Sequence, residues 1–297
     1  MSLPALTGCL SAQAAGGGVP YTNTKCVEFV PGVSNRNYQQ LTFGSTKGWP
    51  GGSTVDATYA LFKEDNAFSV SLWLKSTTST SVVAIPWGRY NGGTTNAPGV
   101  NASFSPTGVN YFFFRNAAGG IMQNNTGTTA LWNGDWHHVV WTYDGSGNAS
   151  GLKFYMDDAL VAWTTTGSNL GTASSIQVSS AFILGNRETE TSRANSYNYE
   201  GKMDEVSLWD VELSLAEVQE IYNSGDPADL NSHSQATKLV HWFRLGDASG
   251  DTITATQPNW STNNIDDAST AGAYTRAIGT TNRYTSAQCN IVTDAPP

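Results

Sequence analysis

Apolar and polar residues alternate through much of the chain, which is the spacing of a β-strand with one buried face. The clearest example is Ala67–Lys75, in which every second residue from Phe68 to Leu74 is apolar. Similar segments follow at short spacing, separated by turns rich in Gly, Asn and Ser. The predicted strands are Cys26–Val30, Tyr38–Phe43, Ala67–Lys75, Val82–Trp87, Val109–Arg115, Trp136–Tyr143, Leu152–Met156, Phe182–Leu184, Lys202–Trp209 and Leu239–Leu245.

One segment has helical spacing instead. Ser214 and Glu217 have the spacing of a capping box, in which each side chain bonds the other's backbone N–H. Apolar residues then recur at i, i+3 and i+4 from Val218 to Tyr222, and Asn223–Gly225 ends the helix. One short helix among about a dozen strands predicts an all-β protein, an antiparallel β-sandwich of the jelly-roll type.

The composition changes at both ends of this series of strands. Residues 1–24 include the flexible run Gly16–Pro20 and do not alternate, so we expect an N-terminal arm. Residues 25–225 form the predicted jelly-roll domain. Residues 226–297 combine a polar linker, the strand at Leu239–Leu245 and a Thr-, Asn- and Asp-rich extension. We expect both terminal segments to be extended and to pack on other subunits of an assembly.

The charge balance excludes several classes of protein. With 15 Lys and Arg against 24 Asp and Glu, the net charge is −9, which argues against binding to nucleic acid. No apolar run reaches 18 residues, so no membrane-spanning helix is predicted. Charged residues are only 13% of the chain, and Ser, Thr, Asn and Gly replace them, as on the surface of an extracellular protein.

The chain has three cysteines, Cys9, Cys26 and Cys289, too scattered for a zinc site. Terminal strands of sandwiches often lie side by side, so a Cys26–Cys289 disulfide is one alternative; the other is three free thiols. Leu6–Cys9 is similar to a lipoprotein box, but no basic stretch precedes it, so no export signal is expected. An extracellular type of surface without such a signal indicates a protein released by lysis, such as a virion component, or a chain trimmed of its signal.

Four motifs follow one another along the chain: Phe68–Lys75, Trp136–Gly145, Leu152–Val161 and Glu200–Trp209 with the helix after it. In this order they resemble the motifs of laminin-G-like, concanavalin A-like jelly rolls, and the ending resembles that of the pentraxins. Leu239–Asp247 and Asn290–Pro296 are similar to segments that follow such jelly rolls in structural proteins of marine bacteriophages.

The resemblance implies calcium as a cofactor. Pentraxins hold calcium in an acidic loop that corresponds to Glu188 and Glu190 here, and Asn91 in a neighbouring loop would contribute an amide oxygen. Arg187 departs from the pattern, since a cation there repels the metal, and the alternative is a solvated polar loop. Asp204 shares strand parity with Val206 and so faces inward; it either ligates a structural ion or accepts backbone N–H bonds, the second being favoured.

Aromatic residues near Gly- and Asn-rich turns form a candidate carbohydrate-binding platform: Trp87, Tyr90 and Trp132. The alternative for each ring is packing in the core or rim.

No catalytic residues are predicted, and the protein is not expected to be an enzyme. The sequence lacks the E-x-D-x-x-E run of the related glucanases, and the neighbours Asp204 and Glu205 should point to opposite faces of a strand. His137 and His138 lie within a predicted strand, where we expect one to pack and the other to face solvent.

The leading hypothesis is a virion structural protein, either a capsid decoration or an appendage component, located at the virion surface. Its partners would be other virion proteins or copies of itself bound through the termini, and glycans on a cell surface. The alternative is an extracellular, calcium-dependent lectin-like adhesin, and the third hypothesis is a degenerate glycoside hydrolase.

Overall fold

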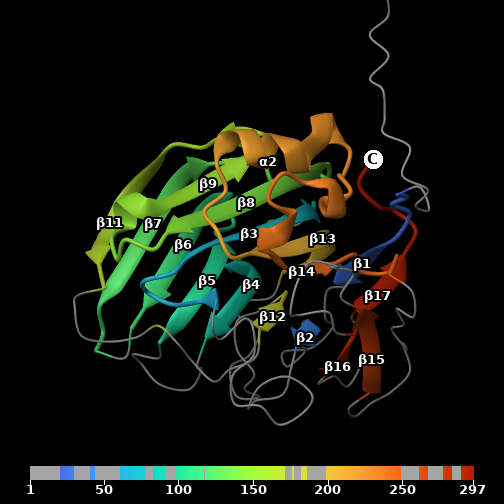
Figure 1. The fold of residues 1–297 in the computed structure, drawn as a ribbon, viewed down its shortest axis with the longest axis horizontal. Helices are drawn as coiled ribbons and strands as arrows, with labels where there is room; N and C mark the ends of the chain where they lie inside the picture. Colours follow the sequence, from blue (N-terminus) through green and yellow to red (C-terminus); the bar gives the residue numbers. More distant parts are fainter. Residues whose placement is uncertain are drawn as a thin grey trace, which may run out of the picture.

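The computed structural model describes residues 21–29, 41–43, 61–77, 83–90, 98–116, 118–170, 176, 182–185, 199–248, 261–266, 277–282 and 289–297. Two antiparallel sheets lie face to face, and the helix α2 covers the outer side of one of them (Figure 1). The predicted all-β sandwich with one short α-helix is therefore confirmed.

The first sheet has the order β10–β9–β8–β3–β13–β1–β17, and β14 also pairs with β13. Its strands are β10 (Ala159–Leu160), β9 (Leu152–Met156), β8 (Trp136–Asp144), β3 (Ala67–Lys75), β13 (Gly201–Trp209), β1 (Cys26–Phe29), β17 (Cys289–Val292) and β14 (Leu239–Phe243). β1 and β14 share one edge of β13: β1 pairs with its first residues and β14 with its last.

The second sheet has the order β11–β7–β6–β5–β4–β12–β2–β16–β15. Its strands are β11 (Trp163–Asn169), β7 (Ile121–Thr128), β6 (Val109–Arg115), β5 (Gly99–Phe104), β4 (Ala84–Tyr90), β12 (Phe182–Leu184), β2 (Leu41–Phe43), β16 (Ala277–Asn282) and β15 (Ser261–Asp266). Four short 3-10 helices complete the described elements: η1 (Ala149–Gly151), η2 (Asn223–Gly225), η3 (Leu230–Ser232) and η4 (Ala236–Lys238).

The core lies between the two sheets. The alternating residues of β3 from Phe68 to Leu74 are completely buried there, as predicted, and they meet the rings of Trp87, Phe104 and Phe112 from the second sheet. The opposite face of β3 is buried as well, because α2 and residues 226–238 pack on the outer side of the first sheet. The buried apolar residues on this outer side form a second core cluster, which contains Val140, Tyr155, Trp209, Leu213, Val218, Ile221, Leu230, Leu239 and Trp242.

The helix α2 (Leu215–Tyr222) begins and ends where the sequence predicts. Ser214 Oγ accepts the backbone N–H of Glu217, and the Glu217 carboxylate accepts that of Ser214, so the capping box is complete. Asn223 ends the helix in the left-handed region at φ 47°, and Val218 and Ile221 are the buried residues. None of the helices in the described part of the chain is long and apolar enough to cross a bilayer.

The two ends of the described chain lie side by side, because β17 pairs with β1. The register sets Cys26 opposite Val292 and Phe29 opposite Cys289. The two cysteines are thus three positions apart, about 10 Å along the strands, which exceeds the roughly 7 Å between Cα atoms that a disulfide spans. Cys26 is a free, buried thiol, so the bridge considered from the sequence is not formed.

The proposed division of the chain at residues 24/25 and 225/226 stays a prediction. In the structure, β14 and β17 from the third part pair with β13 and β1 from the second, so strands of both parts build the first sheet. Most of the predicted N-terminal arm, residues 1–20, lies outside the described residues.

Candidate functional site

The outer face of the second sheet carries aromatic and amide side chains. Along β6, Asn110, Phe112 and Phe114 are buried, whereas Tyr111 and Phe113 are half-buried. This alternation follows from the pleat, which points successive side chains to opposite faces. Tyr111 and Phe113 therefore lie on the outer face, although the three successive phenylalanines make the sequence apolar on both sides.

The strand register arranges these side chains in two rows across the sheet. In row one, Tyr111 lies opposite Asn125 of β7 and Ser103 of β5, and Asn125 lies opposite Thr164 of β11. The strands themselves lie side by side in Figure 1.

Row two lies two residues further along β6 than row one. There Phe113 lies opposite Gln123 and Asn101, and Gln123 lies opposite Gly167 of β11. Each row thus combines one aromatic ring with one amide at directly paired positions.

Only part of each row is accessible. Asn101 is 2% exposed and Ser103 is 7% exposed, so the β5 ends of the rows are covered. Thr164 is exposed, and the β6 and β7 members are half-buried. We call the accessible part the β6–β7–β11 face, defined by Tyr111, Phe113, Gln123, Asn125 and Thr164.

The five side chains that define the β6–β7–β11 face carry no formal charge. Its rings offer apolar surface, and its amides and hydroxyl both donate and accept hydrogen bonds. Arg115 is the charged residue of β6, two residues beyond Phe113, and its guanidinium lies 5.4 Å from the centre of the Phe113 ring. Such a surface suits a ligand with apolar faces and many hydroxyl groups.

A second polar cluster surrounds Asp204 and Glu205 on β13. A β-bulge falls between Asp204 and Ser207, and Glu205 adopts the left-handed region at φ 49°. Because of the extra residue, both Met203 and Val206 reach the core, and Asp204 pairs with Trp73 on the outer side of the first sheet. The prediction that Asp204 faces inward with Val206 was therefore wrong.

Both carboxyl groups of this cluster are buried, and each has partners. Asp204 Oδ1 accepts the backbone N–H of Glu205 at 2.8 Å, which is the alternative favoured from the sequence. The Glu205 carboxylate accepts from the Trp242 indole and from Arg244 Nε at 3.2 Å. Burial raises the pKa of Glu205 to about 7 against the lowering effect of Arg244, and burial with the Glu205 charge raises the pKa of Asp204 well above its usual range.

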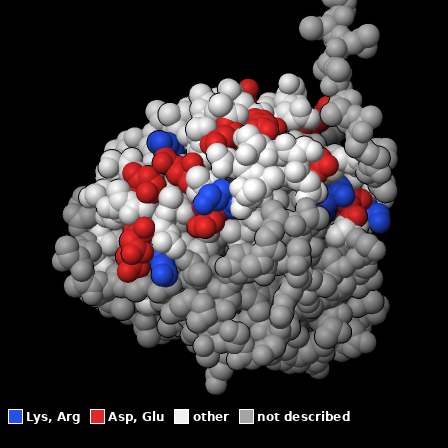
Figure 2. Space-filling view, viewed as in Figure 1, with Lys and Arg blue, Asp and Glu red and all other residues white. Residues whose placement is uncertain are grey.

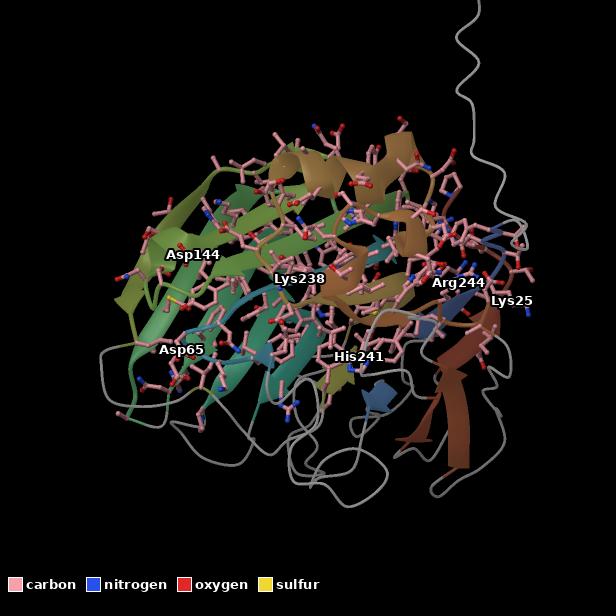
Figure 3. The ribbon with its side chains drawn as sticks, in the orientation of Figure 1. Lys25, Asp65, Asp144, Lys238, His241 and Arg244 are labelled. Atoms are coloured by element: carbon pink, nitrogen blue, oxygen red, sulfur yellow. The ribbon has the colours of Figure 1, made fainter. Side chains whose placement is uncertain are left out.

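This cluster also holds the segment that precedes β1 against the first sheet. The Arg244 guanidinium lies 4.6 Å from the centre of the Tyr21 ring and donates to the Thr22 carbonyl. Asp247 accepts the backbone N–H groups of Thr24 and Lys25 at 2.7 and 2.9 Å. Arg244 and Lys25 lie near each other at one end of the molecule (Figure 3). The cluster therefore fixes residues 21–25 on the sheet.

The remaining predicted site residues lie elsewhere. Trp87 is completely buried among Phe62, Phe112 and other core rings, and a sugar cannot stack on a ring that the core covers. Trp132 is half-buried at the rim, and its indole donates to the Ser105 carbonyl at 3.2 Å. Tyr90 is the last residue of β4, opposite Gly99.

The three predicted calcium ligands Glu188, Glu190 and Asn91 lie outside the described residues. Within the part that the structure describes, no group of three or more His, Cys, Asp and Glu side chains could hold a metal ion.

A family model described as the concanavalin A-like lectin/glucanases superfamily matches residues 50–219. The chain belongs to this superfamily. Among solved structures, a presumed carbohydrate-binding protein from Bacteroides ovatus is similar with a TM-score of 0.52 and 17% identity, over 93% of this chain and 62% of that one. The chain thus spans less than two thirds of that protein. A comparison with curated protein sequences gives no match.

Two further similar structures have lower scores. A pentraxin from Limulus polyphemus has a TM-score of 0.44 and 13% identity, over 67% of this chain and 82% of that one. The CBM40 domain of a Ruminococcus gnavus sialidase has the same score and identity, over 66% and 96%. None of these findings supports the resemblance to bacteriophage structural proteins.

His137 and His138 of this lectin/glucanase-superfamily chain are both buried, at 7% and 1% exposure, so the expectation that one of them faces solvent was wrong. His137 Nδ1 lies 2.6 Å from Asp157 Oδ2. His138 Nε2 bonds Ser71 Oγ at 2.8 Å under the Tyr222 ring of α2. Burial lowers the pKa of His138 to about 3. A serine and histidine covered in this way have no access to a substrate.

Figure 2 shows acidic side chains scattered over the side of the molecule that carries α2, with no gathering of Lys and Arg in its described part. The charge on this side agrees with the net charge of −9 and gives no footprint for a nucleic acid.

Proposed function

We propose that the protein is a non-catalytic lectin that binds glycans through the β6–β7–β11 face. The observation that carries the proposal is the pairing of Tyr111 with Asn125 and of Phe113 with Gln123 on neighbouring strands. Aromatic rings contact the C–H faces of sugars, and amides bond the hydroxyl groups, so the two together fit a glycan. Membership of a superfamily that includes lectins supports this reading.

The proposal favours the lectin alternative over the virion hypothesis, which has no support in the comparisons. The similar protein from Bacteroides ovatus is itself a presumed carbohydrate-binding protein. Extracellular location and contacts of the termini with other subunits stay predictions.

Catalysis is not part of the proposal, although the superfamily also includes glucanases. A retaining glycosidase needs two carboxyl groups about 5–5.5 Å apart on either side of the bond that it cleaves. Neither row of the β6–β7–β11 face contains an Asp or Glu, so nothing there can serve as the acid or the nucleophile.

Calcium remains a proposal that rests on Glu188, Glu190 and Asn91. If these residues hold calcium, a chelator lowers the melting temperature, and changing both glutamates to glutamine abolishes that shift. Identical melting curves with and without chelator would remove calcium from the proposal.

A glycan array with the full chain tests the function, followed by titration of the best glycan. Tyr111→Ala should weaken binding about two- to tenfold, because a ring contact contributes roughly 0.5–1.5 kcal/mol. Tyr111→Phe keeps the ring and should bind within a few-fold of the wild type. Leu160→Ala, at an exposed residue of the first sheet, is the control. No bound glycan, or equal binding by Tyr111→Ala, would overturn the proposal.

A further inference from the structure

The two rows of the β6–β7–β11 face repeat the same chemistry. Tyr111 and Phe113 are two residues apart on β6, and their partners Asn125 and Gln123 are two apart on β7. A strand rises about 3.4 Å per residue, so the rows are about 7 Å apart. A repeated ring-and-amide pair is the arrangement that a ligand built from repeated units would use.

One amide atom on this face lacks a hydrogen-bond partner. Asn125 Oδ1 is buried and accepts no hydrogen bond from the described residues. A buried polar atom without a partner costs free energy, and a ligand hydroxyl reaches this oxygen only if the Asn125 amide turns toward the outer surface. The observation is independent of the repeat and places an unmet hydrogen-bonding group at row one.

The charge of the face defines the ligand class further. The described rows contain no ionisable side chain apart from the Tyr111 phenol, and the Arg115 guanidinium lies beyond them, 5.4 Å from the centre of the Phe113 ring. The protein carries a net charge of −9, which disfavours an anionic partner. Since the rows themselves carry no charged side chain, they suit an uncharged ligand.

We propose that the β6–β7–β11 face binds a neutral oligosaccharide chain, with one sugar unit at Tyr111 and Asn125 and the next at Phe113 and Gln123. The proposal deepens the glycan-binding function and rests on it. The chain runs along β6, from one row to the next. Row one adds the Thr164 hydroxyl, whereas row two ends at Gly167, so the two units meet different neighbours.

The affinity of the full chain for a length series tests this proposal. The probes are glucose, galactose and mannose with their neutral di- and trisaccharides, and sulfated or carboxylated forms of the same sugars. For the best sugar, affinity should rise at least tenfold from mono- to disaccharide and by less than threefold from di- to trisaccharide. Neutral forms should bind at least tenfold more tightly than charged forms.

Variants of row two separate the two units. Phe113→Ala and Gln123→Ala should each lower affinity for the disaccharide at least fivefold and change that for the monosaccharide less than twofold. Phe113→Tyr keeps the aromatic ring, so it separates loss of a sugar contact from loss of packing. Leu160→Ala is the control. Equal affinity for mono- and disaccharide, or preference for charged forms, would overturn the two-unit neutral site while leaving the lectin function intact. Absence of any glycan binding would overturn both.

Discussion

Glu205 and Arg244 form an ion pair with Glu205 Oε1 3.2 Å from Arg244 Nε, in which the glutamate side chain is 4% exposed and the arginine side chain 15%. The pair joins the bulge in β13 to the residue that follows β14, and through the Arg244 guanidinium it also holds Tyr21 and Thr22. One arginine therefore connects three separate parts of the chain, and the first predictions concern this contact.

Arg244→Met should lower the free energy of unfolding by about 3–5 kcal/mol, because it leaves the Glu205 carboxylate buried without its cation. Urea denaturation measures the loss. The matched control is Lys153→Met, in an ion pair with Glu212 whose side chains are 41% and 26% exposed. It should cost at most about 1 kcal/mol. Similar losses for both variants would show that burial does not strengthen the Arg244 contact.

The Asp204–Glu205 pair should make stability depend on pH. The pKa of Glu205 is raised from its ordinary 4.5 to about 7, so the folded protein holds a proton that the unfolded chain releases. Folding binds protons in this range, and the free energy of unfolding should fall as pH rises from about 4.5 to about 7.

Glu205→Gln removes the ionisable group and should flatten this slope by up to about 1.4 kcal/mol per pH unit. Urea unfolding at pH 5, 6 and 7 measures it. Glu212→Gln, at the partly exposed ion pair with Lys153, should keep the wild-type slope. A Glu205→Gln slope equal to that of the wild type would contradict the assignment.

Leu72→Ala should cost about 2–5 kcal/mol, because Leu72 is completely buried between the sheets and its removal leaves a cavity. Leu160→Ala provides the same change at a side chain that is 55% exposed, and it should alter stability by about 0.5 kcal/mol or less. Thermal and urea unfolding of both variants give the comparison. A small loss for Leu72→Ala would indicate that the core collapses around the missing side chain.

The Cys26 thiol should be unreactive in the folded protein. It is completely buried, its Sγ donates to the Asp294 carbonyl, and burial raises its pKa to about 12, so almost no thiolate forms. Alkylation followed by mass spectrometry should leave Cys26 unmodified in buffer and modify it fully in urea without a reductant. Modification that requires a reductant would reveal a disulfide instead.

The strands and the helix could be predicted because their signals are local. The alternation in β3 and the capping box at Ser214 and Glu217 depend on residues two to four positions apart, and both are found where expected. The position of Asp204 could not be predicted, because the bulge depends on a left-handed backbone at Glu205, a residue type that does not require it.

The candidate site was missed for a related reason. In the run Phe112-Phe113-Phe114 both faces are apolar, so the alternation that separates core from surface disappears until the register with β7 is known. Trp87 was a candidate for the sugar platform because it lies near Gly- and Asn-rich turns, but its ring is completely buried in the core, which was the alternative. Pairing between distant strands decides both cases, and a single sequence does not display it.

The pairing of β1 with β17 also has a consequence for synthesis. Cys26–Phe29 leaves the ribosome more than two hundred residues before its partner Cys289–Val292, and contacts so distant in sequence form slowly. Until the last segment emerges, one edge of β1 presents free backbone N–H and C=O groups to other nascent chains. Products truncated before residue 289 should therefore aggregate during expression, and chaperones that shield strand edges should raise the yield of the complete protein.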